Sequence, residues 1–298
     1  MIRAMVGACT HVGRIRDGNE DSFVVIDGLY FVADGMGGHS AGEVASAIAV
    51  GTLSDLHTSA AGGLVTEDQV ADAVSTANLA IFMEAIEDPS KAGMGTTLTG
   101  LVVTDATAHK IVVANVGDSR TYLWRHGELR QVTKDHSHVQ SLVDRGAITR
   151  AEARVHFQRN IVLRAMGIES YVDVDTFPLD VEDGDRFIMC SDGLVDEAAD
   201  DEIEGEIREA TGVQDLADRL VDLANRNGGR DNITVVVVDF ETVDEPVAVA
   251  SEPEGKVICT LPSNEPSRPS PWFAVGAWGM FALSAAITIA VVVSASVS

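Results

Sequence analysis

A short glycine-rich segment, DGMGGH at residues 34–39, follows directly on the apolar run at 29–33. An apolar run of this length, with aromatic and β-branched residues, predicts a buried strand, so the Asp34 carboxylate stands at a strand end. Glycine adopts backbone angles that are closed to other residues, and it lets the main chain approach a bound ion or phosphate closely. The segment therefore predicts a tight ligand-binding loop, although an Asp-Gly turn on its own is common and weakly specific.

Acidic motifs of the same kind recur along the chain. They are NEDS at 19–22, GDSR at 117–120, SDG at 191–193 and RDNIT at 230–234. The last three lie beside apolar segments that are readable as strands. Carboxylates that converge at strand ends would repel one another unless a cation neutralised them, and carboxylate oxygens suit hard cations such as Mg²⁺, Ca²⁺ or Mn²⁺. Each aspartate taken alone is also compatible with a helix cap, a turn or plain surface charge.

Zinc and a cysteine nucleophile both fit the sequence poorly. The 8 histidines include no HExxH motif, and the 3 cysteines form no CxxC pair. A Cys-x5-Arg phosphatase loop would require an arginine at positions where this chain has Ile15, Asp196 and Glu265. The pattern therefore favours an all-oxygen metal site.

Taken in order, the motifs resemble those of a known enzyme family. They are RDGNED at 16–21, DGMGGH at 34–39, GTT at 95–97, GDSR at 117–120, SDGLVD at 191–196 and DNIT at 231–234. In order and interval they are similar to the metal-dependent serine/threonine protein phosphatases of the PP2C (PPM) family, over roughly residues 1–240. The resemblance implies an α+β fold, an αββα sandwich of two antiparallel sheets flanked by helices, with a binuclear Mn²⁺ or Mg²⁺ centre at one end.

The resemblance also implies a role for each matching residue of the metal centre. Asp34 would bridge two metal ions, and Asp192 and Asp231 would complete the first ion. The backbone carbonyl of Gly35 would serve the second ion, and Glu20 would hold waters bound to it.

Further residues are implied around this centre. Asp118, together with Asp192, would bind a third and looser ion, and Asp21 would belong to the same acidic group. Arg16 would bind the phosphate, because a guanidinium fork matches two phosphate oxygens and stays charged at any working pH. The roles of these residues rest on the family resemblance.

The general acid cannot be carried over from the family. Many members place a histidine where this chain has Met36, so that role has no matching residue. His39 is one candidate for it, and a supporting structural role is the alternative. Arg14 and Arg120 are weaker candidates for phosphate binding, with surface charge or an ion pair as the alternative.

The chemistry implied by this set is hydrolysis without a covalent enzyme intermediate. Two metal ions can lower the pKa of a bridging water and hold a phosphoryl group for in-line attack. The resemblance implies phosphoserine and phosphothreonine in proteins as substrates, in opposition to Ser/Thr kinases. Two alternatives stay open, a non-catalytic phosphoprotein-binding module with the same fold and a metal phosphatase for small phosphate esters. Because the acidic motifs and Arg16 are all present, we favour the protein phosphatase.

Hydrophobic periodicity predicts both helices and strands along the chain. Helices are predicted at 41–56, 68–87, 139–145 and 215–225, and strands at 97–103, 110–116, 120–124 and 233–240. The short connection at 125–128 predicts a hairpin, which favours antiparallel sheets over a doubly wound parallel sheet. The polar stretch at 138–171 corresponds in the family to a flap beside the active site, and a plain surface excursion is the alternative.

The C-terminal part differs in composition. We predict an acidic, proline-containing linker at 241–271, a transmembrane helix at 272–293 and a short tail at 294–298. Residues 272–293 carry no charge, and about 20 apolar residues suffice to span a bilayer. We therefore expect a single-pass protein of the cell membrane with a cytoplasmic phosphatase domain at 1–240. A buried helix of a soluble protein is the alternative.

The charge balance limits the partners. With 46 Asp and Glu against 21 Lys and Arg, the formal net charge is −25. Nucleic-acid binding requires a basic surface that this composition does not supply in bulk, so we expect none. Cysteines without a framework spacing fit a reducing cytosol.

Overall fold

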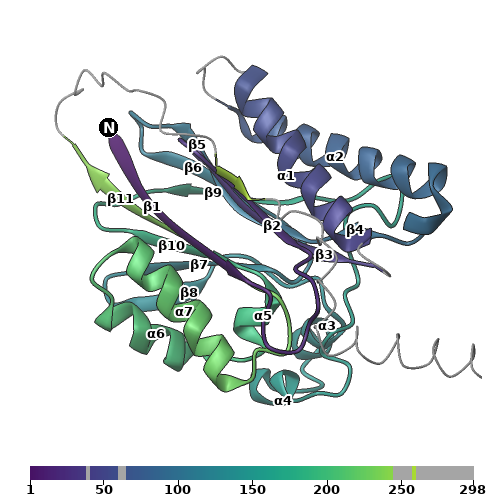
Figure 1. The fold of residues 1–298 in the computed structure, drawn as a ribbon. Coiled ribbons are helices and arrows are strands. Elements are labelled where there is room, and N and C mark those ends of the chain that lie inside the picture. The colour runs from purple at the N-terminus through teal and green to yellow at the C-terminus, as the bar shows by residue number, and fades with distance from the viewer. Residues whose placement is uncertain (38–40, 60–64, 244–256, 260–298) are drawn as a thin grey trace, which may run out of the picture. The chain divides into compact units, whose positions relative to one another are not determined.

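The computed structural model describes residues 1–37, 41–59, 65–243 and 257–259 (Figure 1). Residues Met1–Leu261 form one compact unit. The predicted transmembrane helix at 272–293, the tail at 294–298 and most of the predicted linker lie outside the described residues. Within the described residues, no helix combines the length and the apolar character needed to cross a bilayer.

The compact unit contains two antiparallel sheets. In spatial order, the first consists of β1 (Ile2–His11), β11 (Ile233–Thr242), β10 (Arg186–Cys190), β7 (Arg120–Arg125) and β8 (Glu128–Gln131). The second consists, in the same order, of β12 (Val257–Cys259), β2 (Asp21–Ile26), β3 (Leu29–Met36), β5 (Leu98–Asp105), β6 (Lys110–Val116) and β9 (Asp175–Asp180), with β4 (Gly95–Thr96) paired to β3. The strand pairs of both sheets are antiparallel, as the sequence predicted.

Helices cover the outer face of each sheet (Figure 1). The second sheet is covered by α1 (Ala41–Ser59) and α2 (Glu67–Glu87), and the first by α6 (Asp200–Glu209) and α7 (Val213–Asn227). The shorter helices are η1 (Pro89–Lys91), α3 (His138–Asp144), α4 (Arg150–Arg154) and α5 (Asp192–Val195). The expected αββα sandwich is confirmed.

Strand β3 shows how the sequence produces these layers. Successive side chains of a strand point to opposite faces. Tyr30 and Val32 pack with residues of β10 and β11 between the sheets, whereas Leu29, Phe31 and Ala33 pack under α1 and α2. All are buried, which explains why the strand reads as an uninterrupted apolar run.

Hydroxyl and carboxylate groups join the two sheets at the end where the acidic motifs lie. The hydroxyl oxygens of Thr97 and Ser119 lie 2.7 Å apart. In the same region Ser191 Oγ donates to Asp21 Oδ2 at 2.8 Å. Because buried hydrogen bonds need defined geometry, these contacts fix the relative position of the strand ends that carry the aspartates.

The predicted elements are present with modest changes at their ends. The strand predicted at 97–103 is β5, the hairpin at 125–128 joins β7 to β8, and the helix predicted at 215–225 begins earlier, at Val213. The predicted flap at 138–171 contains α3 and α4 and is otherwise irregular. The apolar segment read as a strand beside residues 191–193 is β10, whereas β1, β9 and α6 were not predicted.

Replacing Gly7 by alanine is expected to destabilise the sandwich. Strand β1 packs directly against the start of α7, and a Cβ atom at Gly7 would lie 2.4 Å from the backbone nitrogen of Gln214. Overpacking of this kind costs about 1–3 kcal/mol in the free energy of unfolding. Chemical denaturation of the purified protein would measure this loss.

Gly205→Ala is the matched control. Gly205 lies within α6, and a Cβ atom added there meets nothing within 4 Å. Alanine in a helix interior is more stable than glycine by roughly 0.5–1 kcal/mol, so this variant should gain stability. Equal unfolding free energies for the two variants would contradict the close packing of β1 against α7.

Candidate active site

The acidic motifs meet at one end of the sandwich. Asp34 lies in β3 and Asp21 opens β2 directly opposite it in the ladder. Asp192 begins α5 after β10, Asp231 precedes β11, and Asp118 follows β6. Burial raises the pKa of Asp34, and the surrounding carboxylates of Asp21, Asp192, Asp118 and Asp231 raise it further. The structure thus brings the predicted aspartates within electrostatic range of one another.

The other carboxylates of the cluster are perturbed in the same direction. Burial, followed by the Asp118 carboxylate, raises the pKa of Asp192. Burial raises the pKa of Asp118 to about 7, with a further contribution from Asp135. The pKa of Asp21 rises to about 6, again mainly through burial. The ionised forms of all these carboxylates are disfavoured because the groups are buried and close to one another. A bound cation would stabilise the ionised forms.

Part of the cluster remains open to solvent. Asp34, Asp192 and Asp231 are half-buried, whereas Asp21 and Asp118 are buried. The Oδ1 atom of Asp21 is buried without a hydrogen-bond partner in the structure. A ligand can therefore reach the site from outside, and an unpaired oxygen lies behind the open carboxylates.

The cluster fits hard divalent cations by its donor chemistry. Its donors are carboxylate oxygens, and among the described residues no Lys or Arg forms an ion pair with Asp34, Asp118 or Asp192. Across the same described residues, no three His, Cys, Asp or Glu side chains already enclose a position for a metal ion. The repulsion among the carboxylates and the unpaired Asp21 oxygen are therefore the two features that favour a divalent cation at this site.

The GTT motif holds the backbone of Asp34 in place. The Asp34 carbonyl accepts hydrogen bonds from the Thr97 amide and the Thr96 hydroxyl, both at 2.9 Å. The Asp34 amide donates to Thr97 Oγ1 at 3.2 Å. The carboxylate is therefore presented from a backbone that is fixed on both sides.

Gly35 and Glu20 lie against the start of α1. The Gly35 amide donates to the Glu20 carbonyl at 3.2 Å, and a Cβ atom at Gly35 would lie 2.2 Å from the Gly42 carbonyl oxygen. Only glycine fits this approach. Burial raises the pKa of the half-buried Glu20 carboxyl. The metal roles of Gly35 and Glu20 stay predictions.

Arg16 lies at the open edge of the cluster. Its Nη2 donates to Asp231 Oδ2 at 2.7 Å, and half of its side chain, 50%, is exposed. A guanidinium in this position can donate to a phosphate through its other N–H groups while Nη2 stays hydrogen-bonded to Asp231. The alternative residue Arg120 is half-buried and forms an ion pair with the buried Asp135 at 2.7 Å, and Arg14 is exposed. His39 lies outside the described residues, so its role stays a prediction.

Asn232 is a residue whose role the sequence analysis missed. Its Oδ1 accepts from the Glu20 amide at 2.8 Å, and its Nδ2 donates to the carbonyls of Val12 and Gly18 at 3.0 and 2.9 Å. This side chain therefore holds the loop that carries Arg16 and Glu20 against the start of β11. The DNIT motif contains the residue, but only the folded chain reveals its partners.

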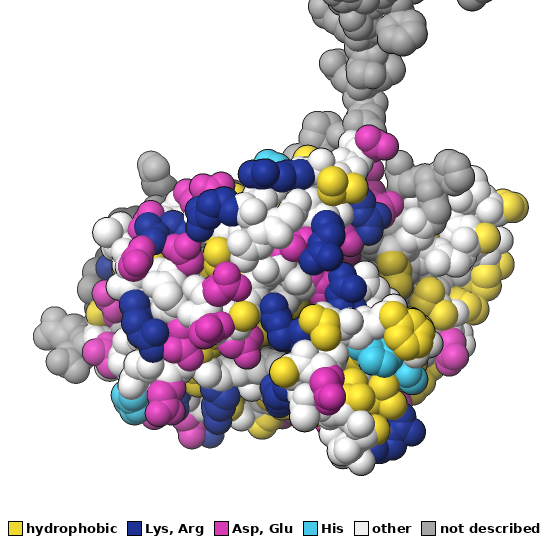
Figure 2. All heavy atoms as spheres, turned by 90° about the horizontal axis from the view of Figure 1, so that it is seen from below, with side chains coloured by type: hydrophobic (Ala, Val, Ile, Leu, Met, Phe, Trp, Pro, Cys, Tyr) yellow, Lys and Arg dark blue, Asp and Glu magenta, His cyan; other side chains and the backbone are white. Residues whose placement is uncertain are grey.

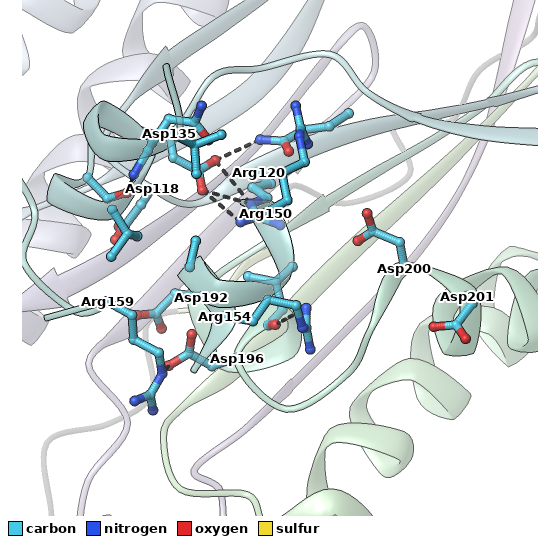
Figure 3. A pocket seen from close by; sticks show the side chains of 17 residues that line it. Asp118, Arg120, Asp135, Arg150, Arg154, Arg159, Asp192, Asp196, Asp200 and Asp201 are labelled. Carbon is cyan, nitrogen blue, oxygen red and sulfur yellow. Dashed lines mark hydrogen bonds and ion pairs between the residues drawn. The ribbon is translucent and has the colours of Figure 1, made fainter. Parts of the chain in front are cut away.

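A cavity of about 380 Å³ lies beside the cluster, between the core and the flap (Figure 3). The residues of both signs that line it include Asp118, Asp192, Asp196, Arg150, Arg154 and Arg159. Arg159 Nε lies 3.2 Å from Asp196 Oδ2, and Arg154 Nη1 donates to the Val195 carbonyl at 3.0 Å. The flap is thus joined to α5, the helix that begins with Asp192.

Comparison with known proteins agrees with this geometry. Residues 16–233 match the family model described as Protein phosphatase 2C. The chain is 40% identical over 263 residues to the serine/threonine protein phosphatase PstP of Mycobacterium tuberculosis, covering 87% of this chain and 50% of that protein. It therefore spans about half the length of that relative.

Shorter relatives are covered almost completely. The chain is 39% identical over 238 residues to the serine/threonine phosphatase stp of Listeria welshimeri, covering 77% of this chain and 93% of that protein. The crystal structure of the PstP catalytic domain in complex with 2 manganese ions has a TM-score of 0.74 and 38% identity, covering 81% of this chain and 100% of that one. The chain belongs to the protein phosphatase 2C family.

Proposed function

We propose that the chain is a metal-dependent protein phosphatase that hydrolyses phosphoserine and phosphothreonine in proteins. The observation that carries the proposal is the group of aspartates that raise one another's pKa around Asp34, with Arg16 at its open edge. Relatives that carry the name serine/threonine phosphatase support this reaction.

The proposed cofactor is Mn²⁺ or Mg²⁺, held as two tight ions and a third, looser one. Asp34, Asp192 and Asp231 would hold the ions together with the Gly35 carbonyl and waters on Glu20, and Asp118 with Asp192 would take the third. The manganese ions in the complex of the PstP catalytic domain support this choice. Such ions supply a water of lowered pKa and neutralise the charge of the phosphoryl group.

The protein's own residues position the phosphate. Arg16 can donate two parallel hydrogen bonds to phosphoryl oxygens, while its bond to Asp231 Oδ2 limits the directions in which the guanidinium can point. The Asn232 amide donates to Asp231 Oδ1 at 2.9 Å and holds the other carboxylate oxygen. In-line attack needs this alignment because the reaction at phosphorus depends on the angle between the attacking water and the leaving oxygen.

The side chains exposed on the flap favour a protein as the substrate. Its side chains Phe157 and Val155 are 86% and 82% exposed, and the rings of His156 and Phe157 stack with centroids 4.7 Å apart. On the face seen in Figure 2, positive and negative side chains intermingle, and hydrophobic side chains gather at the right, with histidine side chains among them. Apolar groups exposed beside a catalytic site favour contact with a polypeptide over a small ester. Ser/Thr kinases are the proposed opponents, and they are candidate substrates.

A non-catalytic phosphoprotein-binding module is the second candidate. Such a module would have the same fold but would lack at least one of the residues that hold the metal ions. The presence of Asp34, Asp192, Asp231 and Arg16 favours the enzyme. Turnover of phosphothreonine peptides, compared with that of small phosphate esters, would separate the protein phosphatase from the remaining alternatives.

Asp34→Asn should lower kcat on a phosphothreonine peptide by at least about 100-fold, equivalent to roughly 2.7 kcal/mol of barrier. The amide removes a negative charge from the proposed bridging position without changing the shape of the side chain. Phosphate release with Mn²⁺, with Mg²⁺ and with EDTA would be measured alongside. Asp72→Asn, an exposed aspartate of α2, is the control and should keep wild-type kcat. Full turnover by Asp34→Asn in EDTA would refute the mechanism.

Manganese should stabilise the protein more at neutral than at acidic pH. In the chelated protein, protonation of Asp21 and Asp118 contributes stability that is complete below about pH 4 and is lost as the pH rises through their folded pKa values of about 6 and about 7. A bound cation would neutralise the carboxylates that have lost their protons. At a concentration of about 100 Kd, Mn²⁺ adds roughly 2.7 kcal/mol, or about 5 °C in Tm.

Thermal unfolding with Mn²⁺ and with EDTA, at about pH 5 and about pH 7.5, would measure this difference. The gain in Tm should be large at the higher pH and much smaller at the lower one. An equal gain at both pH values would show that Mn²⁺ does not bind the perturbed carboxylates.

We further propose that residues 272–293 anchor the chain in the cell membrane with the phosphatase domain in the cytoplasm. The uncharged segment is long enough to span a bilayer, and Lys256 and Arg268 lie on its N-terminal side, in keeping with the tendency for positive charge to stay inside. The full-length chain should sediment with membranes, and a chain ending at Leu261 should be soluble and active. Digestion of the domain by protease added outside intact cells would contradict the orientation.

A further inference from the structure

His136 bonds to both peptide groups of the glycine that precedes Asp118. The His136 amide donates to the Gly117 carbonyl at 2.9 Å, and the Gly117 amide donates to His136 Nδ1 at 3.0 Å. Gly117 has a φ of +107°, and a Cβ atom there would lie 2.6 Å from Thr97. One histidine therefore holds both peptide groups of the turn that presents Asp118 to the cavity. The Asn115 side chain supports the same turn, since its Nδ2 donates to the Gly117 carbonyl at 3.2 Å.

The same histidine contacts the C-terminal part of the flap and residues that follow it. The His136 carbonyl accepts from the Leu163 amide at 2.7 Å, and His136 Nε2 lies 3.1 Å from Asp175 Oδ2. Arg164 Nη1 donates to Asp175 Oδ1 at 2.6 Å and to the Asp173 carbonyl at 3.3 Å. His136 thus lies between the Asp118 turn and the C-terminal part of the flap.

These contacts determine the tautomer of the ring. A backbone amide can only donate, so Nδ1 must be the acceptor for Gly117, and the proton of the neutral ring lies on Nε2. Nε2 then donates to Asp175. Arg164 Nη1 lies 3.0 Å from Nε2, but both groups are donors, so each bonds to the carboxylate between them. Burial lowers the pKa of His136, which agrees with a neutral ring.

We propose that His136 is a positioning residue for the phosphatase reaction, because it couples the position of the flap to that of the Asp118 carboxylate. The inference rests on the proposed function. Movement of the flap at Leu163 acts on the His136 backbone, and movement at Arg164 acts through Asp175 on the ring. Both reach Gly117, and so the adjacent carboxylate, through His136. A polypeptide bound by the flap would hold Asp118 at the edge of the metal centre, whereas a small ester that does not reach the flap would not.

Two isosteric variants separate the two sides of the ring. In His136→Asn the side-chain oxygen takes the place of Nδ1 and can accept from Gly117, but nothing reaches Asp175. In His136→Gln the amide nitrogen takes the place of Nε2 and can donate to Asp175, but the acceptor for Gly117 is lost. Steady-state kinetics on a phosphothreonine peptide and on p-nitrophenyl phosphate would be combined with hydrogen exchange of the flap amides.

We expect His136→Gln to lower kcat by about 10-fold on both substrates, which corresponds to roughly 1.4 kcal/mol. We expect the same loss from Asp118→Asn, and no further loss in the double variant. His136→Asn should retain kcat within about 3-fold and raise KM by about 5-fold or more for the peptide alone, with faster exchange of amides at 138–163. A general loss of stability would change both variants and both substrates together.

The inference would be overturned if the two variants had the same kinetics on both substrates, or if neither changed the exchange of the flap amides. A wild-type chain that releases phosphate from neither substrate would refute the proposed function instead. Hydrogen exchange alone would then test the coupling. Faster exchange of amides at 138–163 in His136→Asn than in His136→Gln would support it, and equal exchange would refute it.

Discussion

Repulsion among buried carboxylates is the constraint on which this structure depends. Asp34 lies among aspartates from several strand ends, and its pKa is raised by its burial and by its neighbours. In a region of low effective dielectric, such charges cost free energy that the surrounding core has to offset. Threonine and serine hydroxyls join the two sheets at this end, as between Thr97 and Ser119 at 2.7 Å. Buried hydrogen bonds between the sheets therefore lie where the carboxylates repel one another.

The arrangement divides the site into a fixed part and an adjustable part. Asp34 and Asp231 are held by backbone hydrogen bonds, and Asn232 ties the loop of Arg16 and Glu20 to the same strand end. Asp118, by contrast, follows a glycine turn that is bonded to the base of the flap through His136. The proposed metal ligands Asp34 and Asp231 are therefore held by the core, whereas the position of Asp118 depends on the flap.

Sequence reasoning predicted the fold and the main carboxylates because both leave local signals. An apolar run that ends in Asp34 is visible without any structure, and the order of the motifs resembles one family closely enough to imply the αββα sandwich. Asn232 and His136 could not be assigned a role in this way, since each acts through partners distant in the sequence. Strand β9 was missed because its residues are mixed in polarity and only partly buried.

The pairing of β1 with β11 sets the order of events in a growing chain. Ile2 to His11 lie against Thr242 to Ile233 along their whole length, so the first strand cannot complete its sheet until the last one has been synthesised. Asp231 immediately precedes that last strand, whereas Asp34 is made near the beginning. A ribosome-bound chain therefore carries an incomplete set of carboxylates through most of its synthesis. Contacts of such wide sequence separation also fold slowly, so the newly made protein cannot acquire its activity before release of the domain.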